Sequence, residues 1–211
     1  MRYTLPNIFS LSRVIIAPIF LVLFLQSGHI ERIVAVVLFI VAALTDYVDG
    51  WLARKYSQSS TCGTIIDPLA DKILTSTAFV GFALLSLIAW WMVFVVLVRD
   101  VATTALRSYA DSIGRPLITS WGAKAKTFAQ MTFIIAVLVF RTAQALPLSA
   151  QFYDYTAFAL QPLVVQSLML LVTFITVWTG IEYFLDNRDI LRPCYLRILR
   201  LARRRARRTL S

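Results

Sequence analysis

The chain has 211 residues, of which 59% are hydrophobic and only 15% are charged. Soluble globular domains average roughly 45–50% apolar and about 25% charged residues. The composition therefore excludes a disordered or fibrous chain and a soluble nucleic-acid-binding domain. It favours an integral membrane protein. The two cysteines, Cys62 and Cys194, provide no disulfide framework.

Taken in chain order, the apolar runs predict an all-α integral membrane protein with six transmembrane helices, each needing about 20 apolar residues. A short, weakly amphipathic N-terminal segment over residues 5–13 leads into the first helix. The six spans cover approximately residues 8–27, 32–55, 68–88, 89–111, 124–146 and 161–185.

Two longer connections lie between the later spans, and neither is predicted to cross the membrane. Residues 112–123 contain turn residues and are expected to link two helices on the cytoplasmic side. Residues 147–160 are expected to form an interfacial loop at the opposite face. The whole is one six-helix transmembrane domain over residues 1–190, followed by a basic tail over residues 191–211.

The distribution of positive charge predicts the orientation in the membrane. The chain carries 21 Lys and Arg against 11 Asp and Glu, and only Arg32 and Arg141 fall on the side away from the termini. The positive-inside rule then places both termini in the cytoplasm, at the cell inner membrane. An arginine cluster directly after a span favours attraction to anionic lipid over binding of nucleic acid. Its members are Arg192, Arg197, Arg200, Arg203, Arg204, Arg205, Arg207 and Arg208.

Four aspartates gather near the cytoplasmic face, where a charged group in a membrane helix is costly. Asp46 and Asp49 lie three residues apart at the end of the second span. Asp67 and Asp71 lie four apart at the start of the third, so each pair shares a helix face. A short connection makes the two helices antiparallel neighbours and brings the carboxylates together. All-oxygen ligands suit Mg²⁺ or Mn²⁺, and His29, the only histidine, falls on the far side of the membrane.

Small residues beside the second aspartate add a possible ligand surface. Gly50 and Ala53 would let a phosphate-bearing ligand approach the helix backbone closely, or they would serve ordinary helix packing. Arg54 follows with a planar donor fork that suits a phosphate.

Written in full, the stretch is Asp46-x2-Asp49-Gly50-x2-Ala53-Arg54-x8-Gly63-x3-Asp67-x3-Asp71. It resembles the signature of the CDP-alcohol phosphatidyltransferases at every fixed position and spacing. The resemblance implies six transmembrane helices, usually a homodimer, a polar cavity that opens to the cytoplasm, and two divalent cations.

The resemblance also implies roles for individual residues. Asp46, Asp49 and Asp67 would be metal ligands. Asp71 would be a ligand of the second ion and the general base. Asn7, Ser10 and Arg13 resemble the family's Asn-x-x-Thr-x-x-Arg element, with serine replacing threonine. The CDP-alcohol site would be lined by Asn7, Asp46, Asp49, Gly50, Ala53, Arg54 and Ser60.

The fourth and fifth spans carry cations that suggest an acceptor bearing a phosphate. The expected phosphate-binding residues are Arg99, Arg107, Lys124 and Lys126. The runs Arg99-Asp100-x6-Arg107 and Gly122-x-Lys124-x-Lys126-Thr127-x2-Gln130 are similar to elements of the bacterial phosphatidylglycerophosphate synthases, although Asp100 replaces a usual Glu. Because Arg99 and Asp100 sit in an otherwise apolar helix, they are also expected to form an internal ion pair.

The sequence thus predicts transfer of a phosphatidyl group from CDP-diacylglycerol to sn-glycerol 3-phosphate, with release of CMP. The alternative is a sister transferase whose acceptor is phosphatidylglycerol, as in the cardiolipin synthases, or inositol phosphate or serine. A different class, a small cation transporter, would spread its acids through the membrane and contain broken helices.

Overall fold

The computed structural model describes residues 5–56, 63–114, 117, 121–144, 146 and 149–188. Side chains are described for these residues except at 5–11, 46–56, 63–71, 112, 121, 123 and 150. Within the described residues the secondary structure is entirely helical.

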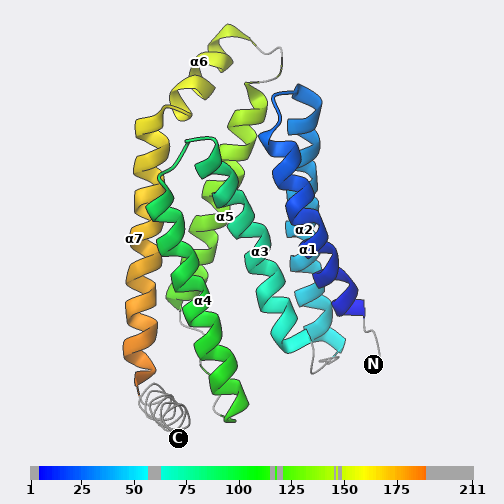
Figure 1. Ribbon diagram of the computed structural model, residues 1–211, viewed down its shortest axis with the longest axis vertical. Coiled ribbons are helices and arrows are strands. Elements are labelled where there is room, and N and C mark those ends of the chain that lie inside the picture. Colours follow the sequence, from blue (N-terminus) through cyan, green and yellow to red (C-terminus); the bar gives the residue numbers. More distant parts are fainter. Residues whose placement is uncertain are drawn as a thin grey trace, which may run out of the picture.

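Seven helices occur in this part of the chain (Figure 1). Six are long and one, α6, is short. They are α1 (Leu5–Leu25), α2 (His29–Tyr56), α3 (Gly63–Leu84), α4 (Trp90–Ser112), α5 (Trp121–Ala143), α6 (Ala150–Ala159) and α7 (Pro162–Asp186).

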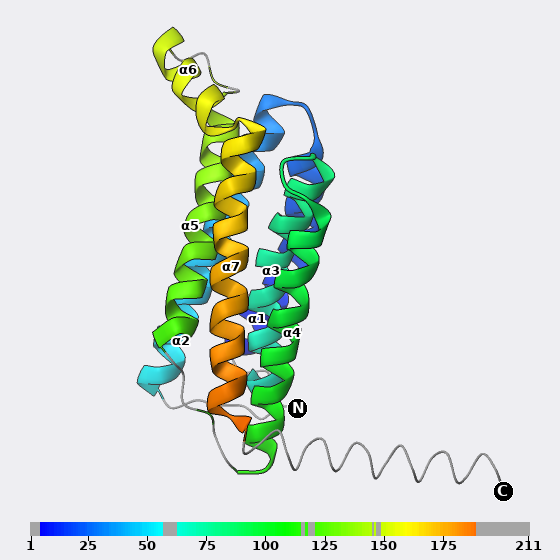
Figure 2. The same cartoon turned by 90° about the vertical axis from the view of Figure 1, so that its left-hand side faces the viewer.

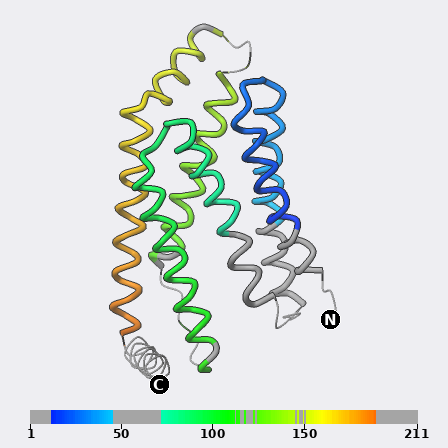
Figure 3. The backbone as a smooth tube through the Cα atoms, viewed as in Figure 1, coloured from blue at the N-terminus to red at the C-terminus, as the bar shows by residue number. Residues whose placement is uncertain are grey.

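The six long helices run along the long axis of the molecule (Figures 1 and 2). Helix α1 packs against α2 and α3, while α7 packs against α4 and α5. Helix α1 begins and α7 ends at the same end of the bundle, and α6 lies at the other end between α5 and α7 (Figure 3). Consecutive long helices therefore run in opposite directions along this axis (Figure 1).

Phenylalanines from four helices hold the apolar core together. The ring of Phe20 on α1 lies 5.3 Å from that of Phe39 on α2. Phe82 on α3 lies edge-on to Phe24 of α1 at 5.6 Å and to Phe133 of α5 at 6.1 Å. Offset and edge-to-face ring pairs of this kind add stability beyond the area that they bury.

The close approach of α1 and α3 depends on the absence of a side chain at Gly81. A Cβ atom there would lie 3.2 Å from the Cδ1 atoms of both Leu21 and Phe24. Glycine at this position therefore lets the two helices pack at short range, as small residues do in membrane helix pairs.

The outer surface of the bundle carries large apolar side chains. Phe128, Leu163 and Trp178 are 75%, 77% and 63% exposed. Within the described residues, Lys124–Ala143 and Pro162–Asp186 are long and apolar enough to cross a membrane, and Ser12–Leu25 and Lys72–Leu84 are shorter apolar helices. Exposed apolar surface of this extent marks contact with another apolar phase. The chain is a membrane protein.

One local prediction needs correction. The interfacial loop expected over residues 147–160 contains a ten-residue helix, Ala150–Ala159. Residues 150–159 include no glycine or proline to interrupt a helix, and the break falls instead at Gln161, directly before Pro162 at the start of α7. The expected N-terminal entry segment is the first part of α1, which runs without interruption from Leu5 to Leu25.

Candidate functional site

Three cationic side chains surround a buried carboxylate on α4. Asp100 is 6% exposed, and one of its oxygens accepts a hydrogen bond from Nζ of Lys126 on α5 at 2.5 Å. Arg99 Nη1 lies 3.4 Å from the same oxygen, and Lys72 Nζ on α3 lies 3.8 Å from the other. We refer to Lys72, Arg99, Asp100 and Lys126 as the Asp100 cluster. Three cations around one carboxylate give the cluster a net charge of about +2 near neutral pH.

Helix α7 faces this cluster with hydroxyl groups. Thr179 Oγ1 accepts a hydrogen bond from Arg99 Nη2 at 3.1 Å, and Thr176 Oγ1 accepts one from Gln130 Nε2 at 3.4 Å. Both threonine hydroxyls donate their own hydrogen to the carbonyl four residues earlier in α7, at 2.8 and 2.7 Å. The hydroxyl oxygens therefore offer lone pairs to α4 and α5.

Two glycines permit this close arrangement. A Cβ atom at Gly180 would lie 3.0 Å from Cγ of Arg99, so the missing side chain makes room for the arginine against α7. A Cβ atom at Gly122 would lie 3.1 Å from Cγ2 of Thr179, so glycine also lets the start of α5 pack closely on α7.

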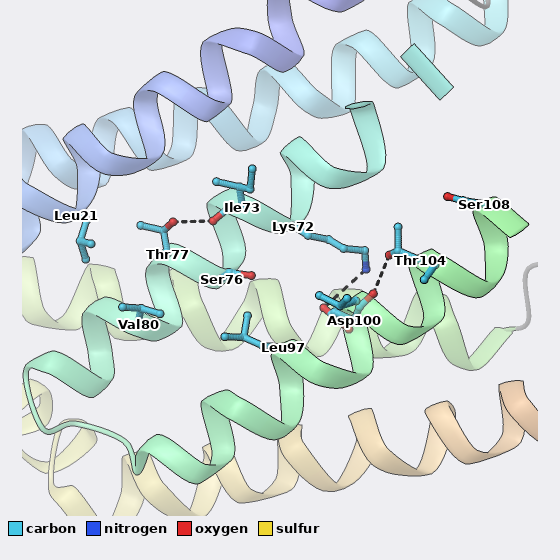
Figure 4. A pocket seen from close by; sticks show the side chains of 12 residues that line it. Leu21, Lys72, Ile73, Ser76, Thr77, Val80, Leu97, Asp100, Thr104 and Ser108 are labelled. Carbon is cyan, nitrogen blue, oxygen red and sulfur yellow. Dashed lines mark hydrogen bonds and ion pairs between the residues drawn. The ribbon is translucent and has the colours of Figure 1, made fainter. Parts of the chain in front are cut away.

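Two cavities meet at Lys72 and Asp100. The larger has a volume of about 520 Å³ and lies between α1, α3 and α4, with Leu21, Val80 and Leu97 among its mainly apolar lining (Figure 4). The smaller has about 30 Å³, is bordered by Lys126 and Gln130 as well as by Lys72 and Asp100, and has room for about one water molecule. The Lys72–Asp100 pair thus lines both an apolar and a polar space.

The structure brings together two of the four cations expected to bind the acceptor phosphate. Arg99 and Lys126 meet at Asp100, and the expected ion pair between Arg99 and Asp100 is confirmed. Arg107 and Lys124 have exposed side chains and line neither of these two cavities.

Sequence reasoning missed Lys72. It follows the signature's last aspartate inside an apolar run, and no local pattern links it to Asp100 on a different helix. A charged residue within a membrane helix is itself a signal of function, and this signal could have identified Lys72.

The signature aspartates lie on the helices where the sequence puts them. Asp46 and Asp49 fall within α2, and Asp67 and Asp71 within α3. Arg13 on α1 is only 2% exposed. Several expected groups lie outside the described part: the side chains of the four aspartates, Asn7, Ser10, Gly50, Ala53 and Arg54, and the whole of Ser60, Cys62, Cys194 and the tail over residues 191–211.

The arrangement is that of a helical membrane protein with buried cations beside an apolar cavity. The family model of the CDP-alcohol phosphatidyltransferases matches residues 3–181. The chain belongs to the CDP-alcohol phosphatidyltransferase family, and it is an enzyme of that class.

Several curated proteins are similar over most of their length. A Mycobacterium tuberculosis (strain H37Rv) protein named probable phosphatidylglycerophosphate synthase is 37% identical over 183 residues, which cover 85% of this chain and 79% of that protein. The CDP-diacylglycerol–glycerol-3-phosphate 3-phosphatidyltransferase of Bacillus subtilis is 32% identical over 202 residues, covering 90% and 98%. The protein of the same name from Escherichia coli K12 is 34% identical over 143 residues, covering 65% and 78%.

Proposed function

We propose that this enzyme transfers the phosphatidyl group of CDP-diacylglycerol to sn-glycerol 3-phosphate, giving phosphatidylglycerophosphate and CMP. The observation that carries the proposal is the Asp100 cluster, a buried net positive charge in a member of this family. A buried positive charge attracts an anion strongly because the low dielectric screens it little. The names of the similar proteins agree with glycerol 3-phosphate as the acceptor.

The proposal includes two divalent cations, Mg²⁺ or Mn²⁺, held by the four signature aspartates. Carboxylate oxygens are the ligands that these hard cations prefer. The ions would neutralise the negative charge that develops on the pyrophosphate as its bond breaks. The ligands would be Asp46, Asp49, Asp67 and Asp71.

We assign to Asp71 the role of the general base that removes the proton of the acceptor hydroxyl. A hydroxyl is a weak nucleophile until a base removes its proton. The Asp71 carboxylate would take the proton from a hydroxyl of glycerol 3-phosphate, and the oxygen would attack the phosphorus attached to diacylglycerol. The bond from that phosphorus to the oxygen of CMP would break, so that CMP leaves with the electron pair.

The residues that resemble the family's nucleotide site are assigned to CDP-diacylglycerol. Arg13, whose burial is unusual for a charged side chain, belongs to the same N-terminal element as Asn7. The proposed CDP-alcohol site comprises Asn7, Asp46, Asp49, Gly50, Ala53, Arg54 and Ser60. The acceptor phosphate is assigned to the neighbourhood of Arg99 and Lys126, whose positive charge would attract it, with Arg107 and Lys124 as more exposed cations that attract it from the cytoplasm.

We further propose six membrane spans in the inner membrane, with both termini cytoplasmic, and a homodimer. The chain's two cysteines test the orientation because both are expected in the cytoplasm. A membrane-impermeant maleimide should leave Cys62 and Cys194 unlabelled in intact cells. It should label a cysteine introduced at Ser149, at the end of the bundle that holds α6. The reverse pattern would overturn the orientation.

The mass of the detergent-solubilised protein, measured by light scattering, tests the proposed homodimer.

The experiment that tests the function is CMP release by purified protein given CDP-diacylglycerol, Mg²⁺ or Mn²⁺, and one acceptor at a time. Release that depends on glycerol 3-phosphate is the expected result. Release only with phosphatidylglycerol, inositol phosphate or serine would keep the reaction class and replace the acceptor. Folded protein that releases no CMP with any acceptor would refute the proposal.

A further inference from the structure

We propose that Lys72, positioned by Asp100, binds the phosphate of the acceptor, and that Arg99 and Lys126 add positive charge from the far side of the carboxylate. The site would then select a phosphomonoester over a phosphodiester. This inference rests on the proposed function and adds to it a contact residue, a positioning residue and a reason for the choice of acceptor.

Lys72 is the cation of the Asp100 cluster that a ligand can reach. Its side chain is 24% exposed, against 12% for Arg99 and 5% for Lys126. Its ammonium is also held least tightly, at 3.8 Å from the carboxylate. Because Lys72 lines the cavity of about 520 Å³, a group in that cavity can contact the ammonium without displacing Asp100.

A second donor stands beside it. Ser76 lies four residues further along α3, so it shares a helix face with Lys72, and both line the larger cavity (Figure 4). The hydroxyl of Thr104 donates to the backbone carbonyl of Asp100 at 2.7 Å and therefore offers this cavity only lone pairs. Lys72 and Ser76 can thus both donate to a phosphate at the polar end of the cavity.

The charge of the cluster matches a phosphomonoester. In the described part of the chain, the ion pairs of Lys72, Arg99 and Lys126 all end on Asp100, which leaves about +2 uncompensated. A phosphomonoester carries about −1.5 to −2 near pH 7, whereas a phosphodiester carries one negative charge. The monoester therefore balances the cluster, and the diester leaves a buried positive charge, which is unfavourable.

Asp100 is the positioning residue in this arrangement. Without its carboxylate, three cations from three helices would repel one another and would lose their common partner. Lys126 and Arg99 do not line the larger cavity. Their effect on a phosphate there is electrostatic, and it depends on the carboxylate that keeps them in place.

The test compares Lys72→Gln, Asp100→Asn and Asp100→Glu with Asp111→Asn, an exposed carboxylate on the same helix, as the control. CMP release gives kcat and the KM for each substrate. Lys72→Gln and Asp100→Asn should each raise the KM for glycerol 3-phosphate about tenfold, the size expected for one hydrogen bond to a charged group. The KM for CDP-diacylglycerol should stay near that of the unmodified enzyme. Asp100→Glu should restore most of the affinity, and Asp111→Asn should behave as the unmodified enzyme.

Folded Lys72→Gln with an unchanged KM for glycerol 3-phosphate would overturn the inference. So would a rise of both KM values together, or a fall in kcat alone, because a merely structural role predicts those patterns. If Asp100→Asn fails to fold, Lys72→Gln decides the question by itself. An unmodified enzyme that uses only phosphatidylglycerol would refute the proposed function, whereas one that uses glycerol 3-phosphate with an unaltered Lys72→Gln KM would refute this inference alone.

Discussion

Lys126 on α5 and Asp100 on α4 form an ion pair of 2.5 Å in which the two side chains are only 5% and 9% exposed. The pair joins two helices that residues 113–120 separate in the sequence, and it does so where no bulk water can replace either partner. Removal of Lys126 would take away the shortest hydrogen bond to Asp100 and leave that carboxylate with Arg99 and Lys72 alone, a larger loss than that of an exposed pair.

Lys126→Gln should therefore lower the stability of the protein by roughly 2 kcal/mol, the size expected for a lost hydrogen bond to a charged group, and raise the KM for glycerol 3-phosphate. Lys124→Gln, two residues away on the same helix but exposed, should have little effect on stability. Thermal unfolding in detergent and steady-state kinetics on both variants check the contrast. Equal shifts in the two variants would show that burial of the pair does not matter.

Asp71→Asn should keep the fold and should still bind CDP-diacylglycerol, because the amide is close to the carboxylate in size. Turnover should fall by a factor of about 100 or more, since the general base would be lost. Single-turnover CMP release together with a lipid-binding assay separates these steps. Near-normal turnover would remove Asp71 from the role of base.

Gly180→Ala should raise the KM for glycerol 3-phosphate roughly fivefold. The new Cβ atom would lie 3.0 Å from Cγ of Arg99 and would weaken a hydrogen bond to a charged group, on the order of 1 kcal/mol. Gly81→Ala is the matched control, because its Cβ atom would press on Leu21 and Phe24 instead. That variant should lower the melting temperature and raise the KM less than Gly180→Ala does, because Leu21 lines the larger cavity away from Lys72 and Asp100 (Figure 4). A larger rise of the KM in Gly81→Ala than in Gly180→Ala would contradict the packing described for α7.

Removal of divalent cations with EDTA should abolish CMP release, and Mg²⁺ or Mn²⁺ should restore it. Carboxylates gathered near one face repel one another unless a cation lies between them. The effect should therefore extend to stability, with a lower melting temperature in EDTA. Full activity after exhaustive chelation would refute the proposed metal site.

Much of the fold followed from hydrophobic periodicity. The six apolar runs correspond to the six long helices, and within the described residues Lys124–Ala143 and Pro162–Asp186 have the length and composition to cross a membrane. Helix α6 was missed because its exposed, aromatic and polar residues, such as Tyr153 and Asp154, resemble an interfacial loop. Its formation depends on backbone hydrogen bonding within a short segment, which hydropathy does not report.

The site was predictable only in part, for a similar reason. Arg99 and Asp100 are neighbours in sequence, so an ion pair between them could be expected. Lys72 and Lys126 reach the same carboxylate from other helices, and their convergence depends on how α3, α4 and α5 pack together. The signature aspartates remain a prediction from the sequence, since their side chains lie outside the described residues.

The threonines of α7 hold an arginine without adding a second carboxylate to the Asp100 cluster. A carboxylate at position 179 would also fix Arg99, but it would lower the net charge of the cluster by one. The hydroxyl of Thr179 fixes Arg99 with a dipole instead, and its own proton is already given to the helix backbone. The helix thus keeps Arg99 in place, and the excess of positive charge around Asp100 is preserved for an acceptor phosphate.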